Sequence, residues 1–272
     1  MQEGKKIYFA SDFHLGAQGV ENSNEREKLV IDWLCAIQND AQAIYLLGDI
    51  FDFWFEYKYV VPKNYVRLFA KLAELKDKGI EIFAFTGNHD MWTFGYWEEI
   101  TGMKVFHQPI EIKYNNVTFY IGHGDGLGPG DYAYKALKKM FRNRFLQWCL
   151  ARVHPNLTFA VAQKWSAKSR INNIRKDEVF KGKENEFLYQ YCLDIVQNKA
   201  IDYFVFGHRH LALNLKIGSC KSRYINLGEW VGPHKHFAVF DGQNLEIYSF
   251  KSIKNIIDLH FKQLSNFSEI QI

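Results

Sequence analysis

Short apolar runs alternate along most of this 272-residue chain with segments in which apolar residues recur every three or four positions. The first pattern is typical of buried strands and the second of amphipathic helices. Strands are therefore expected at residues 7–10, 43–47, 80–85, 117–121 and 203–206. Helices are expected at residues 25–38 and 65–78. Four more strands, mostly antiparallel to one another, are expected at residues 211–217, 223–226, 236–240 and 245–250.

This alternation of strands and helices predicts a mixed α/β fold. The chain is long enough to bury the core of one domain and leave room for an insertion. Its composition, 47% hydrophobic and 24% charged, is that of an ordinary globular protein, and a net charge of +4 favours no class of partner.

The sequence also predicts a cytoplasmic protein. Its four cysteines form no CxxC pair and are expected to be reduced thiols. The polar first residues run directly into an expected strand, so no signal peptide is expected. No apolar stretch approaches the roughly 18 residues that a membrane-spanning helix needs.

Each of the first five expected strands is followed at once by residues that can bind metal ions. They lie in five blocks, Asp12–His14, Gly48–Asp52, Gly87–Asp90, Gly122–Asp125 and Gly207–His210. Side chains at the carboxyl ends of neighbouring strands of an α/β sheet converge on one site. Oxygen and imidazole ligands suit manganese, iron, zinc or magnesium. A structural zinc ion is typically held by cysteine thiolates, and no cysteine lies in any block.

Each block has an ordinary explanation when it is taken alone. His123 could be a buried histidine of the core, and Gly48-Asp49 could form a turn. His208 and His210 would share one face of a strand without any metal. Five such blocks in succession are better explained by one centre that binds two metal ions.

One segment departs from the rest in charge. Residues 131–183 contain 13 lysines or arginines and three acidic residues, whereas the remainder of the chain has 21 basic and 27 acidic residues. The segment also carries apolar residues at helical intervals, and Pro155 should divide it into two or more helices. Its composition fits a solvated basic face, a lid over an anionic and apolar ligand, or a nucleic-acid surface.

The order and spacing of the five blocks resemble those of the calcineurin-like metallophosphoesterases. The resemblance implies a four-layer α/β/β/α sandwich with the basic segment inserted as a helical lid. It also implies a centre of two divalent cations, most typically Mn²⁺, with Fe, Zn and Mg as alternatives. Asp49 would bridge the two ions. The ligands implied for one ion are Asp12, His14 and His210, and those implied for the other are Asn88, His123 and His208.

Within that superfamily the chain is most similar to the UDP-2,3-diacylglucosamine hydrolases, the pyrophosphatases of lipid A biosynthesis. The similarity includes the helical insertion after the fourth block and a closing motif at residues 226–230. It implies a metallophosphoesterase domain at residues 1–250, a lid at about 131–183 and a C-terminal extension at 251–272. The extension matches nothing in the family and is expected to be a packed helix or a contact with a partner.

The same resemblance implies particular substrate and catalytic residues. His89, oriented by Asp90, would protonate the leaving group. Substrate would contact Asn88, His89, Asp131, Ser169, Asn173, Lys176 and His208. Apolar lid residues, together with the aromatic run at residues 51–55, would receive the acyl chains, although aromatic residues beside such a loop are as often part of the core.

Two residues depart from the pattern of that family. His89 stands where the better-known members have arginine, and Arg209 stands where many have threonine. The implied reaction releases UMP and 2,3-diacylglucosamine 1-phosphate at the inner surface of the inner membrane, with peripheral membrane contact and no nucleic acid. The alternative is another calcineurin-like phosphodiesterase or nuclease that uses the basic lid for a different phosphoester.

Overall fold

The computed structural model describes residues 1–17, 22–177 and 179–250, and for residues 168–177 it describes the backbone only. In this part of the chain the strands form two mixed sheets. The first has the order β11-β10-β1-β2-β3-β4, with β1 Lys6–Ala10, β2 Ala41–Leu47, β3 Glu81–Phe85, β4 Lys104–Phe106, β10 Lys235–Phe240 and β11 Leu245–Phe250. The second has the order β5-β6-β7-β9-β8, with β5 Ile110–Tyr114, β6 Val117–Ile121, β7 Tyr203–Phe206, β8 Ala212–Lys216 and β9 Arg223–Leu227.

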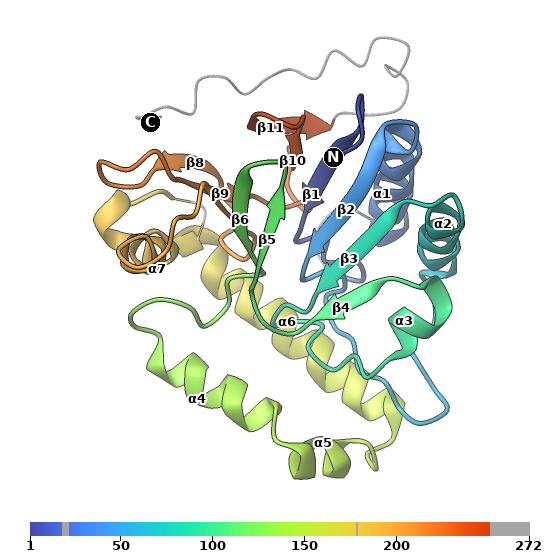
Figure 1. Ribbon diagram of the computed structural model, residues 1–272. Coiled ribbons are helices and arrows are strands. Elements are labelled where there is room, and N and C mark those ends of the chain that lie inside the picture. The colour runs from blue at the N-terminus through green and yellow to red at the C-terminus, as the bar shows by residue number, and fades with distance from the viewer. Residues whose placement is uncertain (18–21, 178, 251–272) are drawn as a thin grey trace.

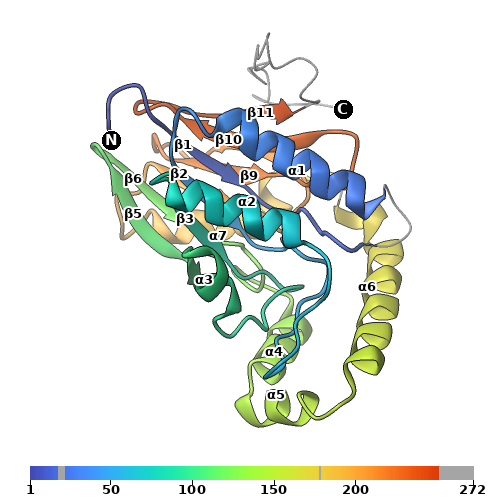
Figure 2. The same cartoon turned by 90° about the vertical axis from the view of Figure 1, so that its right-hand side faces the viewer.

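Helices cover the outer face of each sheet. The first sheet is covered by α1 Ser23–Ile37 and α2 Val66–Asp77, with the short α3 Tyr96–Thr101 beside them, and the second by α7 Phe187–Ile195 (Figures 1 and 2). A 3₁₀ turn at Lys183–Asn185 precedes α7. Three further helices belong to the basic segment: α4 Tyr132–Phe141, α5 Arg144–Leu150 and α6 Pro155–Asp177.

Successive side chains of the central strands point to opposite faces of the sheet and pack into different layers of the core. On β1, Ile7 and Phe9 pack between the two sheets, whereas Tyr8 and Ala10 pack toward the helices of the first sheet. Leu188 of α7 belongs to a third cluster on the outer face of the second sheet. This period-two alternation explains why the strands are apolar throughout. The expected α/β/β/α sandwich is therefore confirmed.

The strand directions bring the metal-ligand blocks to the same end of both sheets. Strands β1, β2 and β3 are neighbours and run parallel, as do β6 and β7. The last expected strands pair antiparallel as β8 with β9 and β10 with β11, but β9 runs parallel to β7. Expected strands and helices agree with the structure to within about two residues at either end.

Four short elements were not expected from the sequence, namely α3, β4, β5 and α7. Strand β5 illustrates why, because it lies at an edge of its sheet and its polar residues Glu111 and Lys113 are exposed. Its apolar residues are only half-buried, so its alternation is short and weak.

The basic segment crosses the open end of the sheets. Figure 1 shows α4 and α5 below the sheets, on the side to which β2 and β3 point, and α6 running obliquely from the lower ends of the strands down toward α5. The expected division at Pro155 is confirmed, since α6 begins at that residue, where a proline is tolerated. Asn143 begins α5, with its side chain accepting hydrogen bonds from the backbone of Phe145 and Leu146.

No helix in residues 1–17, 22–177 and 179–250 is both long enough and apolar enough to cross a membrane. The expected extension at 251–272 lies outside the described residues. The proposed division into domain, lid and extension remains a prediction.

Candidate metal centre

The loops that carry the candidate ligands have unusual backbone conformations. Nine described residues other than glycine have positive φ, and five of them are predicted metal ligands: Asp12, His14, Asp49, His208 and His210. A sixth, Asp131, is a predicted substrate residue. Each such conformation costs on the order of 1–3 kcal/mol and persists where the surrounding structure imposes it, most often at functional sites.

Glycines allow these loops to approach one another closely. A Cβ atom at Gly87 would collide with the carboxylate of Asp49, and one at Gly207 would collide with the carboxylate of Asp12. The first two loops are also joined by backbone hydrogen bonds, such as that from the His14 N–H to the Asp49 carbonyl, at 2.9 Å. Gly87 and Gly207 are therefore needed for the close packing of these loops.

Asp12, His14 and His210 form the first group of possible ligands. His210 Nε2 lies 3.3 Å from Asp12 Oδ1 and 3.2 Å from His14 Nε2. Asp12 and His14 are almost completely buried, whereas about a quarter of the His210 side chain is exposed. Three ligand atoms thus face a common point that is open on one side.

Asp49, His123 and His208 form the second group, beside Asn88. Asp49 Oδ2 lies 3.2 Å from His123 Nε2 and 3.9 Å from His14 Nε2 of the first group. Asn88 Oδ1 lies 3.3 Å from His123 Nε2. One oxygen of Asp49 therefore lies between the two groups, which is the position of a bridging ligand.

In His123 and His210 the ring nitrogen that faces away from the centre has a partner of its own. His123 Nδ1 lies 2.7 Å from the carbonyl oxygen of Leu47, which can only accept, so this nitrogen carries the proton. His210 Nδ1 lies 3.4 Å from a carboxylate oxygen of Glu229. Such contacts orient metal-binding histidines and leave Nε2 free to bind. Glu229 was not among the residues predicted from the sequence.

The carboxylates of the centre attract positive charge. Burial alone would lower the pKa of His123, but the negative charge of Asp49 raises it to about 10. Burial likewise opposes protonation of His210, but a hydrogen bond to Asp12 raises its pKa to about 9. Although burial raises the pKa of Asp49, the neighbouring histidines, His123 above all, hold it well below the usual range. Both groups therefore offer ionised carboxylates to a cation.

The donor set fits two divalent cations. Carboxylate oxygens, an amide oxygen and imidazole nitrogens suit Mn, Fe, Zn and Mg. Each group contains at least three donors with atoms within 4.8 Å of one another. The residues expected to form the centre thus lie in two adjacent groups, with Asp49 of the second group 3.9 Å from His14 of the first.

The family assignment follows from comparison with known proteins. The family model of the calcineurin-like phosphoesterases matches residues 5–212. The chain belongs to this family.

Two relatives indicate which members the phosphoesterase resembles. It is 34% identical to a UDP-2,3-diacylglucosamine hydrolase of Porphyromonas gingivalis (strain ATCC BAA-308 / W83) over 265 residues, 92% of this chain and 99% of that protein. It is 25% identical to the UDP-2,3-diacylglucosamine hydrolase of Histophilus somni (strain 129Pt), over 83% of this chain and 92% of that protein. Among solved structures it is similar to Yfce, a phosphoesterase from E. coli, with 16% identity, coverage of 90% and 93%, and a TM-score of 0.45.

Membership of this family makes the protein a metal-dependent hydrolase. The sequence-based assignment to the calcineurin-like metallophosphoesterases is confirmed.

The expectation that Asp90 orients His89 is wrong. The carboxylate of Asp90 does not orient His89, because it accepts hydrogen bonds from the backbone N–H groups of Ile50 and Gly87, both at 2.7 Å. Burial, followed by the charge of Asp49, raises the pKa of Asp90 to about 7. Asp90 therefore joins the second and third loops to each other.

Asp52 takes the position expected of Asp90. Its backbone carbonyl lies 2.8 Å from His89 Nδ1, and its carboxylate lies 3.8 Å from the same atom. The carboxylate also lies 3.5 Å from His14 Nδ1. Asp52 closes the second block, but nothing in the sequence distinguished it from Asp90 as the partner of His89.

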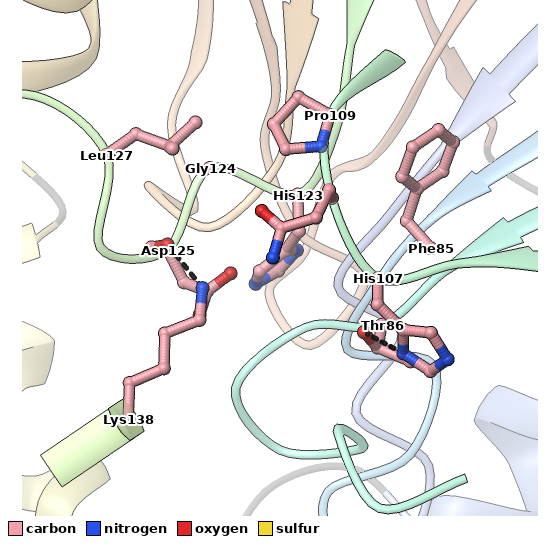
Figure 3. Close-up of a pocket in the computed structure, with 10 residues that line it drawn as sticks. Phe85, Thr86, His107, Pro109, His123, Gly124, Asp125, Leu127 and Lys138 are labelled. Carbon is pink, nitrogen blue, oxygen red and sulfur yellow. Dashed lines mark hydrogen bonds and ion pairs between the residues drawn. The ribbon is translucent and has the colours of Figure 1, made fainter. Parts of the chain in front are cut away.

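The basic segment, which is the predicted lid, is attached to the fourth loop by charge. Lys138 of α4 pairs with the buried Asp125 at 2.5 Å, as Figure 3 shows. Tyr134 donates a hydrogen bond to the same carboxylate at 2.7 Å. Burial raises the pKa of Asp125, but the charges of His123 and Lys138 lower it by more. The net pKa lies below the usual value, so the carboxylate is ionised. The loop that carries His123 thus contacts the lid directly.

Among the predicted substrate residues of the basic segment, the structure describes the side chain of Asp131 but only the backbone of the other three. Asp131 is exposed and precedes the first turn of α4. Ser169, Asn173 and Lys176 lie in α6, but their side chains are outside the described residues.

The aromatic run at residues 51–55 belongs mainly to the core. Phe51, Trp54 and Phe55 are at most 1% exposed, so the expectation that the whole run receives acyl chains is wrong. Phe53 is the exception, because it is only half-buried. Its ring contacts Phe159 of α6 at a centroid distance of 4.9 Å.

Proposed function

We propose that the protein hydrolyses the pyrophosphate bond of UDP-2,3-diacylglucosamine and releases UMP and 2,3-diacylglucosamine 1-phosphate. The observation that carries this proposal is the 34% identity to a hydrolase named for that substrate, over 99% of that relative's length. The aligned length includes the helical insertion as well as the metal centre. We further propose Mn²⁺ as the metal, with Asp12, His14 and His210 binding one ion, Asn88, His123 and His208 binding the other, and Asp49 bridging them.

When bound, two cations at such a centre neutralise charge on a phosphoryl group and lower the pKa of a water molecule. Asp49 holds the two groups of ligands in register through one carboxylate oxygen. Asn88 and His208 are partly exposed, whereas Asp49 and His123 are buried, so in the proposed complex Asn88 and His208 can also contact the phosphoryl oxygens. Asp90 supports catalysis by holding the second and third loops together.

We assign to His89 the protonation of the leaving oxygen. Because the carbonyl of Asp52 can only accept, Nδ1 of His89 carries a proton and Nε2 is the nitrogen available to the substrate. His14, His89 and Asp49 have ligand atoms within 4.8 Å of one another, so the proton would be delivered beside the metal centre. In the protonated state His89 would donate from Nε2 to the oxygen that leaves.

The lid supplies contacts for the sugar nucleotide and its acyl chains. We assign Asp131, Ser169, Asn173 and Lys176 to the head group, on the family resemblance. A cavity of about 300 Å³ lies between α6 and the loop that follows Phe53, and Val61 and Phe159 are among its apolar lining residues. Asp52 also lines this cavity, so it reaches the metal loops. A cavity at this place that is partly apolar and open to solvent on one side supports an acylated substrate.

The outer surface of the lid supports contact with a membrane. Phe145, Leu146 and Trp148 of α5 are exposed, and the guanidinium of Arg152 lies 3.7 Å from the centre of the Trp148 ring. Exposed apolar and basic residues together suit a surface of anionic lipids. We therefore propose a cytoplasmic protein in peripheral contact with the inner face of the membrane.

The basic charge of the lid also favours a second candidate, a phosphodiesterase or nuclease acting on nucleic acid. Residues 131–183 carry ten more basic than acidic residues, and such a surface attracts phosphates.

A turnover assay with Mn²⁺ distinguishes the two candidates. The substrates would be UDP-2,3-diacylglucosamine, a water-soluble aryl phosphodiester and single-stranded DNA. The proposal requires UMP release from the first to be the fastest reaction. Preferential cleavage of DNA, with a rate that falls steeply with salt, would replace it by the second candidate.

A further inference from the structure

One face of α6 turns a polar side chain toward the metal loops. Phe159 and Ser166 are seven residues apart, two turns of helix, and so lie on the same face. Phe159 packs on Phe53, and Ser166 Oγ donates a hydrogen bond to Asp52 Oδ2 at 2.9 Å. Ser166 is 8% exposed, whereas the adjacent Trp165 is 51% exposed. The hydroxyl of Ser166 is therefore aimed inward.

Asp52 connects this hydroxyl to two histidines of the site. Its second carboxylate oxygen, Oδ1, is the atom that lies 3.5 Å from His14 Nδ1 and 3.8 Å from His89 Nδ1. Its backbone N–H donates to the Leu15 carbonyl at 2.9 Å, so the first two loops are joined at the same residue. A change in the rotamer of Asp52 would alter the surroundings of both rings.

We propose that Ser166 is a positioning residue, and that its hydrogen bond to Asp52 sets the orientation of His89 only while α6 lies against the metal loops. Docking of the lid and completion of the site are then one event. The inference rests on the proposed phosphoester hydrolysis but not on the identity of the acylated substrate. It assigns Ser166 no contact with the substrate.

The test compares two substitutions on one helix. Ser166→Ala removes only the hydroxyl oxygen. Thr158→Val is the matched control, because Thr158 is also buried in α6 and its hydroxyl has no hydrogen-bond partner in the part of the chain that the structure describes. Each full-length variant is loaded with Mg²⁺, and its melting temperature is compared with that of the unchanged protein.

Two readouts follow, one kinetic and one spectroscopic. The kinetic readout is kcat and KM for the phenyl and 4-nitrophenyl esters of UMP, whose leaving groups differ in their need for a proton. The spectroscopic readout is the ring-nitrogen NMR signal of His89, assigned with His89→Gln. Partners of this kind typically contribute roughly 10- to 100-fold to activity.

For Ser166→Ala we expect kcat for the phenyl ester to fall about tenfold, a smaller loss for the nitrophenyl ester, little change in KM and a shifted His89 signal. Thr158→Val should change none of these. Equal losses for the two esters, or no loss with an unchanged His89 signal, would overturn the proposal. If the protein hydrolyses the UMP esters but not UDP-2,3-diacylglucosamine, the proposed substrate fails while the comparison of variants stands. The NMR comparison requires no substrate at all.

Discussion

At the scale of single residues, the centre depends most on Asp49. Its Oδ2 lies between His123 and His14, and its Oδ1 accepts a hydrogen bond from the His89 backbone at 2.9 Å. One side chain therefore joins both ligand groups and holds the third loop. Asn88 contributes a single neutral oxygen to one group.

Asp49→Ala should abolish turnover and lower the metal content below two ions per chain, because two metal–ligand bonds are lost together. Asn88→Ala should retain more metal. Elemental analysis after dialysis measures both, with the exposed Asp194→Ala as the control. Two ions per chain in Asp49→Ala would exclude the bridging role.

His89→Ala should lower kcat by roughly 10²–10⁴, the usual contribution of a general acid. The metal content should not change, because His89 is not assigned as a ligand. The loss should be smaller for an aryl phosphodiester with a good leaving group. An equal loss for good and poor leaving groups would instead indicate that His89 positions the substrate.

Metal binding should release protons. In the metal-free protein the pKa values of His123 and His210 are raised to about 10 and about 9, so both rings are protonated at pH 7.5. A metal binds only the neutral imidazole, so about two protons should leave as the centre fills, and affinity should rise with pH until about pH 9–10. Calorimetry in buffers of different ionisation enthalpy counts these protons. Release of none at pH 7.5 would contradict the charge state assigned to the two rings.

The partner of His89 also shows what the sequence could not predict at this scale. Metal-binding residue types were recognisable because each follows an apolar strand. Asp90 is adjacent to His89 in sequence, but the turn directs its carboxylate to the backbone of Ile50 and Gly87. Asp52, 37 residues earlier, is the group that faces the ring. Adjacency along a chain does not determine contacts across a turn.

At the scale of elements, the central strands were predictable because both of their faces are buried. Alternate residues of β1, such as Tyr8 and Phe9, lie in different core clusters, and the strand is therefore a continuous apolar run. Edge elements such as β5 lack that signal. The lid was recognisable as a basic helical segment, but its attachment through Lys138 to Asp125 depends on the folded arrangement.

The exposed apolar residues of the lid should matter for an acylated substrate only. Leu146→Asp should lower kcat/KM for UDP-2,3-diacylglucosamine by about tenfold or more, since burying a leucine contributes about 1.5–3 kcal/mol. The rate with a water-soluble phosphodiester should stay within about twofold, because that substrate needs no apolar surface. Ile100→Asp on α3 is the matched control, because Ile100 is 44% and Leu146 42% exposed. Equal effects of the two changes, or an equal effect on both substrates, would remove the lid from substrate binding.

At the scale of the whole molecule, two sheets place five loops, drawn from residues 12 to 210, around a centre under a helical cover. The parallel pairs β1–β2–β3 and β6–β7 account for this convergence. The fold and the metal chemistry are common to calcineurin-like phosphoesterases, whereas the cavity and exposed apolar residues at the lid bear on the substrate. In the proposed function, the choice of substrate therefore depends on the lid.

The ratio of kcat/KM for UDP-2,3-diacylglucosamine to that for the same sugar nucleotide without acyl chains tests this account most directly. With Mn²⁺ present, we predict a ratio of roughly a hundred or more, since three or four buried methylene groups at about 0.8 kcal/mol each suffice for it. UMP should be the nucleotide product in both reactions. Comparable values of kcat/KM for the two substrates would contradict the account and leave a phosphoesterase whose lid does not recognise lipid.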